Sequence, residues 1–346
     1  MLKIANYDGS VETLVDFVNR VWSEAYAGKM TFPHWTSQFF EWQFRLDRDE
    51  SRDNLIAAYD GPLVVGVLLG TRGMYRTPTG LLPGSQWSWL SIAPDYQSRG
   101  IAKALDMERT RRQRELRSRL IVSYRYVGSR HSLAERPRKG AENTKFNRKI
   151  GFWARVLDPA RFADWHWSPL EGLLAKAASL ISRIPPANPN VRSLNGSDLD
   201  ACLDLTREFN VTLPLSMAWN RDSLFHQLYG NPISQSLVIE EGGRISGFVN
   251  FHLLPFQAKT TERVGIFDLI VMKAATTKGQ IQLLNAAILK MRNQGAILAL
   301  KLRCGDSPSW PLLRTHFIPQ PADSYLVIQG DQFSIPRSAP IHLLWR

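Results

Sequence analysis

The chain has 346 residues, of which 44% are hydrophobic and 21% charged, a composition typical of a globular protein large enough for two domains. No apolar run approaches the roughly 20 residues that a membrane-spanning helix needs, and residues 1–8 turn polar too early for a signal peptide. The two cysteines, Cys202 and Cys304, stand apart from any cluster of histidines. These features predict a cytoplasmic protein without a metal site or a disulfide framework.

The formal net charge of +12 is concentrated in one segment. Residues 99–155 hold 17 Lys and Arg but only 5 Asp and Glu, an excess that equals that of the whole chain. One interpretation is a solvated helix face, and another is attraction of a ligand that carries phosphates. A third is an anionic partner or surface. Nucleic-acid binding is disfavoured, because no aromatic residues or known binding motif accompany the charge.

The first half of the chain predicts a mixed α/β domain, because segments with alternating apolar residues are interspersed with segments of helical periodicity. Ser10 is a suitable N-cap for the first helix, and Asp60-Gly61 is a hairpin signal. In chain order, the expected elements are a strand over 2–7, a helix after Ser10, a helix over 36–46, strands over 54–59, 63–69 and 86–92, a helix to about 117, a strand over 120–127 and a helix over 142–150.

The segment 90–102 is the most informative stretch of the sequence. It begins as the end of a strand, is interrupted by Pro94, and continues from Lys103 as a helix. A loop that opens a helix presents free backbone N–H groups which, together with the helix dipole, form a site for phosphate. Gly100 lies in this loop, and because it has no Cβ the backbone can approach an anion closely.

This segment resembles the acetyl-CoA-binding motif of the GNAT superfamily of acyltransferases, whose positions are filled here by Ile92, Pro94, Gln97, Gly100 and Ala102. The resemblance implies that acetyl-CoA, or another acyl-CoA, binds here as co-substrate and that no metal takes part. It also implies that the Ile92 N–H donates to the thioester carbonyl. The implied cofactor-binding residues are Ser91, Ile92, Gln97, Ser98, Arg99, Gly100, Ile101 and Ala102.

A second resemblance lies in residues 143–152, which end in Lys-Ile-Gly-Phe where GNAT proteins often have Lys-Leu-Gly-Phe. Asn147 stands at the position of the family's frequent general-acid tyrosine, and an amide can only form hydrogen bonds. Asn143 is expected either to contact the pantetheine arm of CoA or to bond its own backbone. Tyr124 and Tyr126, on the strand after the motif helix, are alternative acids for the leaving thiolate or else simply packed aromatics.

No residue is an evident general base. The strand before the motif, residues 86–91, carries no carboxylate where many GNAT proteins have one. The remaining candidates are Glu24, Glu41 and His34 on the predicted acceptor side, or a water molecule.

The second half of the chain repeats the pattern in weaker form. Residues 168–184 predict an amphipathic linker helix, and the Pro-rich run 185–189 predicts a boundary. The order of elements after residue 190 resembles a second GNAT fold, but the Gln-x-x-Gly-x-Ala pattern is absent from residues 273–280. The expected elements are a hairpin of 236–240 and 245–253, a strand over 265–272, a helix over 280–291, a strand over 296–302, a helix over 310–315, and strands over 325–329 and 342–345.

Together these features predict an α/β (α+β) protein with two GNAT-like domains, each a mixed central sheet flanked by helices. The expected division is a GNAT domain over 1–167 that binds acyl-CoA, a linker over 168–189, and a second domain over 190–346 that lacks cofactor. The resemblance implies an N-acetyltransferase that acts by direct attack of a small-molecule primary amine, with the second domain completing the acceptor site or forming a homodimer. Two alternatives remain open: a non-catalytic acyl-CoA-binding scaffold, and an acetyltransferase that acts on a protein partner.

Overall fold

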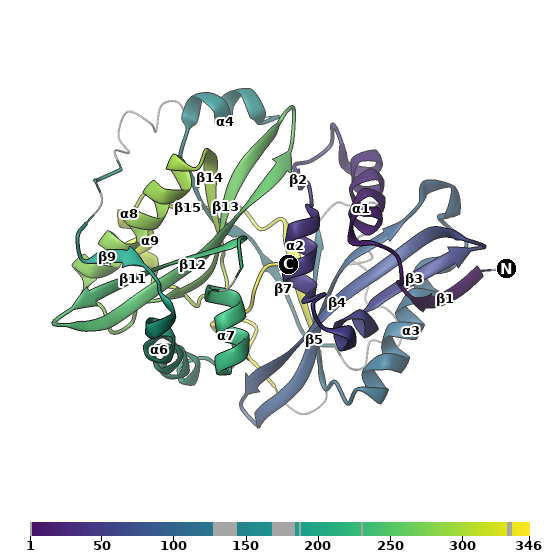
Figure 1. The fold of residues 1–346 in the computed structure, drawn as a ribbon, viewed down its shortest axis with the longest axis horizontal. Coiled ribbons are helices and arrows are strands. Elements are labelled where there is room, and N and C mark those ends of the chain that lie inside the picture. Colours follow the sequence, from purple (N-terminus) through teal and green to yellow (C-terminus); the bar gives the residue numbers. More distant parts are fainter. Residues whose placement is uncertain (1, 127–143, 168–183, 187, 230, 331–333) are drawn as a thin grey trace.

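The computed structural model describes residues 2–126, 144–167, 184–186, 188–229, 231–330 and 334–346. In this part of the chain two lobes stand side by side, each built on a mixed sheet with helices on its faces (Figure 1). The predicted fold class is therefore confirmed.

The first sheet has the strand order β1-β3-β4-β5-β6-β16-β7. Its strands are β1 (Leu2–Asn6), β3 (Leu55–Asp60), β4 (Leu63–Thr77), β5 (Gly80–Ile92), β6 (Leu120–Tyr126), β16 (Ser324–Gly330) and β7 (Thr144–Ile150), and β10 (Leu215–Ala218) pairs with both β4 and β17 (Ile341–His342). The helices are α1 (Val11–Tyr26), α2 (Ser37–Phe44) and α3 (Ile101–Glu115), with the short η1 (Asp49–Asn54) and η2 (Pro94–Tyr96).

The sequence explains where these helices begin and which face each one covers. Ser10 and Thr36 cap α1 and α2 by accepting from backbone N–H groups three residues on. The apolar face of α1 and the aromatic residues of α2 enter one large core. The side chains of Ile101 and Leu105, at the start of α3, pack against Trp87 in a separate core on the opposite face of the sheet.

The second sheet has the order β15-β8-β14-β13-β12-β11-β9, with β2 paired to β12. Its strands are β15 (Ile318–Pro319), β8 (Phe152–Val156), β14 (Ala296–Leu302), β13 (Thr261–Val271), β12 (Arg244–Gln257), β11 (Ser234–Glu241), β9 (Val191–Ser193) and β2 (Phe32–Pro33). One face is covered by α6 (Leu199–Val211) and α7 (Arg221–Leu228), and the other by α8 (Thr277–Asn293) and α9 (Ser309–Arg314). The remaining short elements are α4 (Pro159–Trp165) and η4 (Gly196–Asp198).

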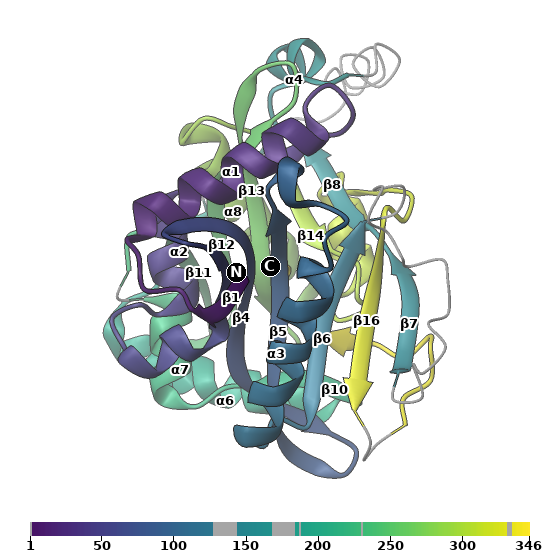
Figure 2. The same cartoon turned by 90° about the vertical axis from the view of Figure 1, so that its right-hand side faces the viewer.

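The two lobes exchange strands. Strand β8 comes from the first half of the chain but pairs with β14 in the second sheet. Strand β16 comes from the second half but lies between β6 and β7 in the first sheet, as Figure 2 shows. The sheets are therefore not confined to the two halves predicted from the sequence. The predicted linker helix falls almost entirely on residues 168–183, outside the described residues, so the boundary over 168–189 stays a prediction.

One predicted element is wrong. Residues 142–150 were expected to form a helix, but Thr144–Ile150 form strand β7. The strand pairs with β16 from Ser324↔Ile150 to Gln329↔Thr144. Its partner lies about half the chain length away, so this tertiary pairing overrides the local periodicity that predicted a helix.

Candidate active site

The predicted phosphate loop adopts the geometry of an anion site. Ser98 and Gly100 have φ values of 62° and 79°, and Gly100 is the residue before α3. Ala104 is the first residue whose N–H is bonded back into the turn, to the Gly100 carbonyl at 3.0 Å. The N–H groups at the start of α3 therefore point out of the helix end. The Gln97 N–H, in contrast, donates to the Pro94 carbonyl at 3.1 Å.

The neighbouring strands part beside this loop. Strands β5 and β6 are parallel and pair from Gly84↔Leu120 to Trp87↔Ser123, although β5 continues to Ile92 and β6 to Tyr126. In the described residues the last part of β5 thus has no ladder partner on its β6 side. Figure 2 shows the two strands next to each other, with α3 in front of them.

A bulge in β5 lies at this parting. Val67 pairs with Ser91 and Leu69 pairs with Ser88, so Trp89 and Leu90 together stand opposite one residue of β4. Trp89 has a φ of 52°, which is uncommon for a residue with a Cβ. The bulge shifts the register of β5 just before the loop.

The register also determines where the Ile92 backbone points. Ile92 stands opposite Gly66, and the Ala93 N–H donates to the Val65 carbonyl at 3.0 Å. In an antiparallel ladder this makes Ile92 and Gly66 a non-hydrogen-bonded pair, whose N–H and C=O groups point away from each other. The Ile92 N–H is therefore directed toward the side on which β6 has parted from β5.

Packed aromatic rings fill the space on the α1–α2 side of the bulge. The Trp89 ring contacts those of Trp35, Phe40 and Phe44 at centroid distances of 5.3, 5.8 and 5.1 Å. All four side chains are at most 3% exposed. The side chain of Ser91, also buried, accepts from the Trp22 indole N–H at 3.0 Å.

A segment from the far end of the sequence lies against β5 and β6. The Leu344 carbonyl accepts from the Tyr124 hydroxyl at 3.0 Å and from the Gln86 amide at 3.3 Å. The Ser88 hydroxyl donates to the Arg346 carbonyl at 2.8 Å. Burial raises the pKa of Tyr124 well above 10, so this hydroxyl keeps its proton at neutral pH. Of the residues predicted as acids, Tyr124 lies one residue beyond the last β5–β6 pair, and Tyr126 lies two residues farther along β6.

The Arg346 side chain joins this segment to the second lobe. Its guanidinium makes a bidentate pair with Asp268 at 2.6 and 2.9 Å, and both groups are buried. Asp268 also accepts from His252 and Gln227. Burial alone would raise the pKa of Asp268, but Arg346 and His252 outweigh burial and lower it. None of these residues belongs to the GNAT motif, so no local signal in the sequence predicts the network.

The structure does not bring Asn147 to this place. Asn147 lies on β7 opposite Val327, and β16 separates its strand from β6. Asn143 is outside the described residues. The possible bases Glu24, Glu41 and His34 are all exposed.

The corresponding helix of the second lobe differs at its start. The Thr276 hydroxyl caps α8 by accepting from the Gly279 N–H at 3.1 Å, and the Glu241 carboxylate accepts from the Thr276 N–H at 3.0 Å. A Cβ on Gly279 would lie 2.4 Å from a Glu241 oxygen. A side-chain carboxylate thus already occupies the position at which a helix N-terminus would hold phosphate.

Most arginines of α3 have acidic partners on the same helix. Arg109 pairs with Asp106, and both Arg111 and Arg112 pair with Glu108. The helix is therefore ion-paired, but only Arg111 of these three is exposed, whereas Arg109 and Arg112 are largely buried. Arg99, in the loop, instead lies 4.8 Å from the centre of the Tyr96 ring.

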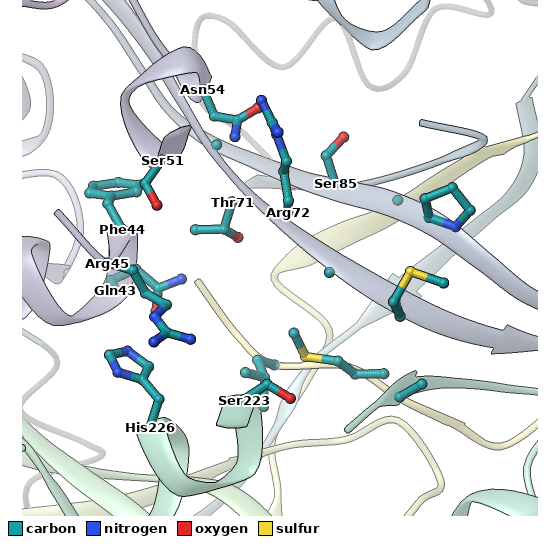
Figure 3. A pocket seen from close by; sticks show the side chains of 18 of the residues that line it. Gln43, Phe44, Arg45, Ser51, Asn54, Thr71, Arg72, Ser85, Ser223 and His226 are labelled. Atoms are coloured by element: carbon teal, nitrogen blue, oxygen red, sulfur yellow. The ribbon is translucent and has the colours of Figure 1, made fainter. Parts of the chain in front are cut away.

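The structure also contains a cavity that no motif predicted. It has a volume of about 560 Å³ and opens between η1, β4 and β5 of the first lobe and α7 of the second. Leu344 is part of its lining. In Figure 3 the side chains of Arg45 and Gln43 face those of Ser223 and His226 across the two lobes, while Arg72 lies beside Asn54 on the opposite wall.

Hydrogen bonds and ion pairs hold the two lobes together at this cavity. The Trp42 indole N–H donates to the His226 carbonyl at 3.2 Å, and the His226 Nε2–H donates to the Trp42 carbonyl at 2.8 Å. Arg45 and Arg48 both pair with Asp222 at 3.0 Å. Burial lowers the pKa of His226, so its ring is neutral at pH 7.

Among the described residues, no group of three or more His, Cys, Asp or Glu side chains could hold a metal ion. None of the helices placed in the structure is long and apolar enough to cross a bilayer. Cys202 and Cys304 are buried free thiols, and burial raises the pKa of each to about 12.

Comparison with protein-family models and with curated protein sequences found no match. Among solved structures, the chain is similar to Saccharomyces cerevisiae N-myristoyltransferase with bound myristoyl-CoA, at 15% identity and a TM-score of 0.76. The match covers 100% of this chain and 89% of that one.

Two further structures are similar to the chain at lower TM-scores. A GCN5-related N-acetyltransferase from Anabaena variabilis matches at 11% identity and a TM-score of 0.52, covering 94% of this chain and 72% of that one. Another from Kribbella flavida matches at 14% identity and a TM-score of 0.53, covering 94% and 70%. The predicted GNAT resemblance is thus confirmed at the level of the fold: the chain has the tandem GNAT fold.

Proposed function

We propose that this protein is an acyl-CoA-dependent N-acyltransferase and that its acyl donor is acetyl-CoA. One observation carries the proposal. The unpaired end of β5, with the Ile92 N–H directed toward β6, lies directly before a helix start with free N–H groups. A donor for a thioester oxygen and a cradle for a pyrophosphate are thus joined by one short loop.

The loop supplies the binding energy for CoA in this proposal. The pyrophosphate lies on the N–H groups that begin at Ser98, and the positive end of the α3 dipole favours its charge. The exposed guanidinium of Arg99 adds a positive charge in the loop. The Gln97 N–H is already used within the turn, so Gln97 contributes through its side chain.

The proposed reaction is direct transfer of the acyl group. The amine nitrogen attacks the thioester carbon, and the Ile92 N–H donates to the oxygen on which negative charge develops. The C–S bond then breaks, the CoA thiolate leaves, and the nitrogen loses a proton to water or a base. The proposed acid for the thiolate is the Tyr124 hydroxyl, which lies beside the parted strands and would turn its proton from the Leu344 carbonyl to the sulfur.

The aromatic packing supports a short acyl group. An acyl chain that extends past the bulge toward α2 meets the buried rings of Trp89, Phe40 and Phe44. A protein interior is close-packed, so an acyl chain could enter it only if these rings moved, which costs free energy. We therefore keep acetyl-CoA as the donor and a small-molecule primary amine as the proposed acceptor, with a protein amine as the alternative.

Calorimetric titration with acetyl-CoA tests the cofactor site. Gly100→Glu, which places a carboxylate in the loop, is expected to abolish binding. Gly61→Glu is a matched control, because Gly61 also has a positive φ of 58° and open space around its missing Cβ. Equal affinity of the two variants would refute the site. Release of CoA thiol, screened over amino sugars, amino acids, polyamines and peptides, then separates an enzyme from a protein that only binds acyl-CoA.

A further inference from the structure

We propose that the cavity between the lobes is a second binding site, and that its ligand is an apolar carboxylate whose charged group lies at Arg45 and Arg48. The proposal rests on the chemistry of the cavity wall and does not depend on the proposed acyl transfer. The volume of about 560 Å³ lies within the range of small-molecule sites.

One part of the cavity wall consists of apolar side chains, two of which remain exposed. Met74 and Leu81 line the cavity and remain 42% and 61% exposed. Leu116, Met217 and Leu344 extend this surface inward. Apolar side chains that converge on one hollow are typical of ligand sites, whereas single exposed ones are ordinary. The body of the ligand is therefore apolar.

Another part of the wall is cationic. Three arginines, Arg45, Arg48 and Arg72, line the cavity together with one carboxylate, that of Asp222, which pairs with both Arg45 and Arg48. The carboxylates of Asp47 and Asp53, which pair with Arg48 and Arg72, are not among the lining residues. The lining therefore favours an anionic group over an ammonium group.

Arg45 also has an unused donor. Within the described residues its Nε is buried and has no hydrogen-bond partner, while its Nη1 donates to Asp222. Figure 3 shows the Arg45 side chain pointing into the cavity. A ligand carboxylate in the cavity cannot contact this enclosed Nε, but it can accept from Nη2, which is not among the buried atoms and has no protein acceptor in the described residues.

Position sets limits on what this ligand can be. Ser85 lines the cavity, and Ile92 lies seven residues farther along the same strand, about 20 Å at the rise of a β-strand. The cavity nevertheless extends toward the bulge, because Phe44 also lines it and its ring lies 5.1 Å from that of Trp89. The carboxylate is thus either the far end of an elongated acceptor or a separate small molecule.

The test is a titration of the full chain with decanoate, decanol and decylamine. Decanoate is expected to bind at least tenfold more tightly than either uncharged decanol or cationic decylamine. Arg45→Gln is expected to weaken decanoate about tenfold, the usual contribution of a charge-assisted hydrogen bond. Arg207→Gln is the control, because this exposed arginine pairs with Asp204 on α6, outside the cavity lining.

A second variant, which is expected to raise the affinity for decanoate, tests the proposal even if Arg45→Gln does not fold. Asp222→Asn removes the carboxylate that competes for both arginines, so decanoate should bind more tightly than to the wild type. Equal binding of the three probes, or weaker decanoate binding to Asp222→Asn, would overturn the proposal. Thiol release from acetyl-CoA with 12-aminododecanoate, but not with decylamine, identifies the carboxylate as the end of an acceptor. Decanoate binding without such release identifies a separate ligand.

Discussion

The Ile92 backbone gives the sharpest test of the proposed chemistry. Because Ile92 and Gly66 are a non-hydrogen-bonded pair, Ile92→Pro removes an N–H that the β4–β5 ladder does not use. Loss of one oxyanion donor usually lowers kcat by about 10²- to 10³-fold. We expect a decrease of that size, with little change in the affinity for acetyl-CoA.

The neighbouring residue provides the contrast. Ala93→Pro removes the hydrogen bond to Val65, so we expect a loss of about 1 kcal/mol or more in the free energy of unfolding. Ile92→Ala shortens the side chain but keeps the N–H, and it should retain kcat within a few fold. The measurements are thiol release at saturating acetyl-CoA and thermal unfolding of each variant. A folded Ile92→Pro protein that binds acetyl-CoA and turns over at the wild-type rate would refute the assigned role.

Two further predictions concern buried groups. Trp89→Ala should cost about 3–5 kcal/mol of stability and raise the rate with hexanoyl-CoA relative to acetyl-CoA, because it opens space beside the bulge. Thiol release with the two donors checks this, and an unchanged ratio would contradict the packing argument. Asp306 has a pKa of about 2, because Lys301 and His342 outweigh the effect of burial, which alone would raise it. Its carboxylate stabilises the fold fully above about pH 4, and this contribution is lost as the pH falls toward 2. Urea unfolding between pH 6 and pH 2 should therefore show a flatter pH dependence for Asp306→Asn than for the wild type, and parallel curves would contradict the assignment.

Local signals in the sequence identified most of the elements and the glycine-containing turn before α3. Ser10 does cap α1 as expected, and Gly100 does lie in the turn before α3, where it has a positive φ. These features depend only on residues that are close in the sequence, so the sequence pattern alone predicts them.

Features that depend on distant pairing could not be predicted in this way. The helix expected over 142–150 is a strand because β16 pairs with it, and nothing near Asn147 indicates such a partner. The cavity is built from α2, η1, β4, β5 and α7, and its arginines belong to no motif. The network of Arg346, Asp268 and His252 likewise joins segments about 80 residues or more from Arg346.

The exchange of β8 and β16 also affects how the chain can be made and divided. During synthesis the first sheet cannot be completed until residues 324–330 have left the ribosome, because these residues form the strand between β6 and β7. Such pairing at long sequence separation is slow to form. A fragment that stops near residue 167 would expose two open strand edges, which are surfaces prone to aggregation. Attempts to produce either lobe alone should therefore supply the exchanged strand, and the two lobes are best regarded as one folding unit.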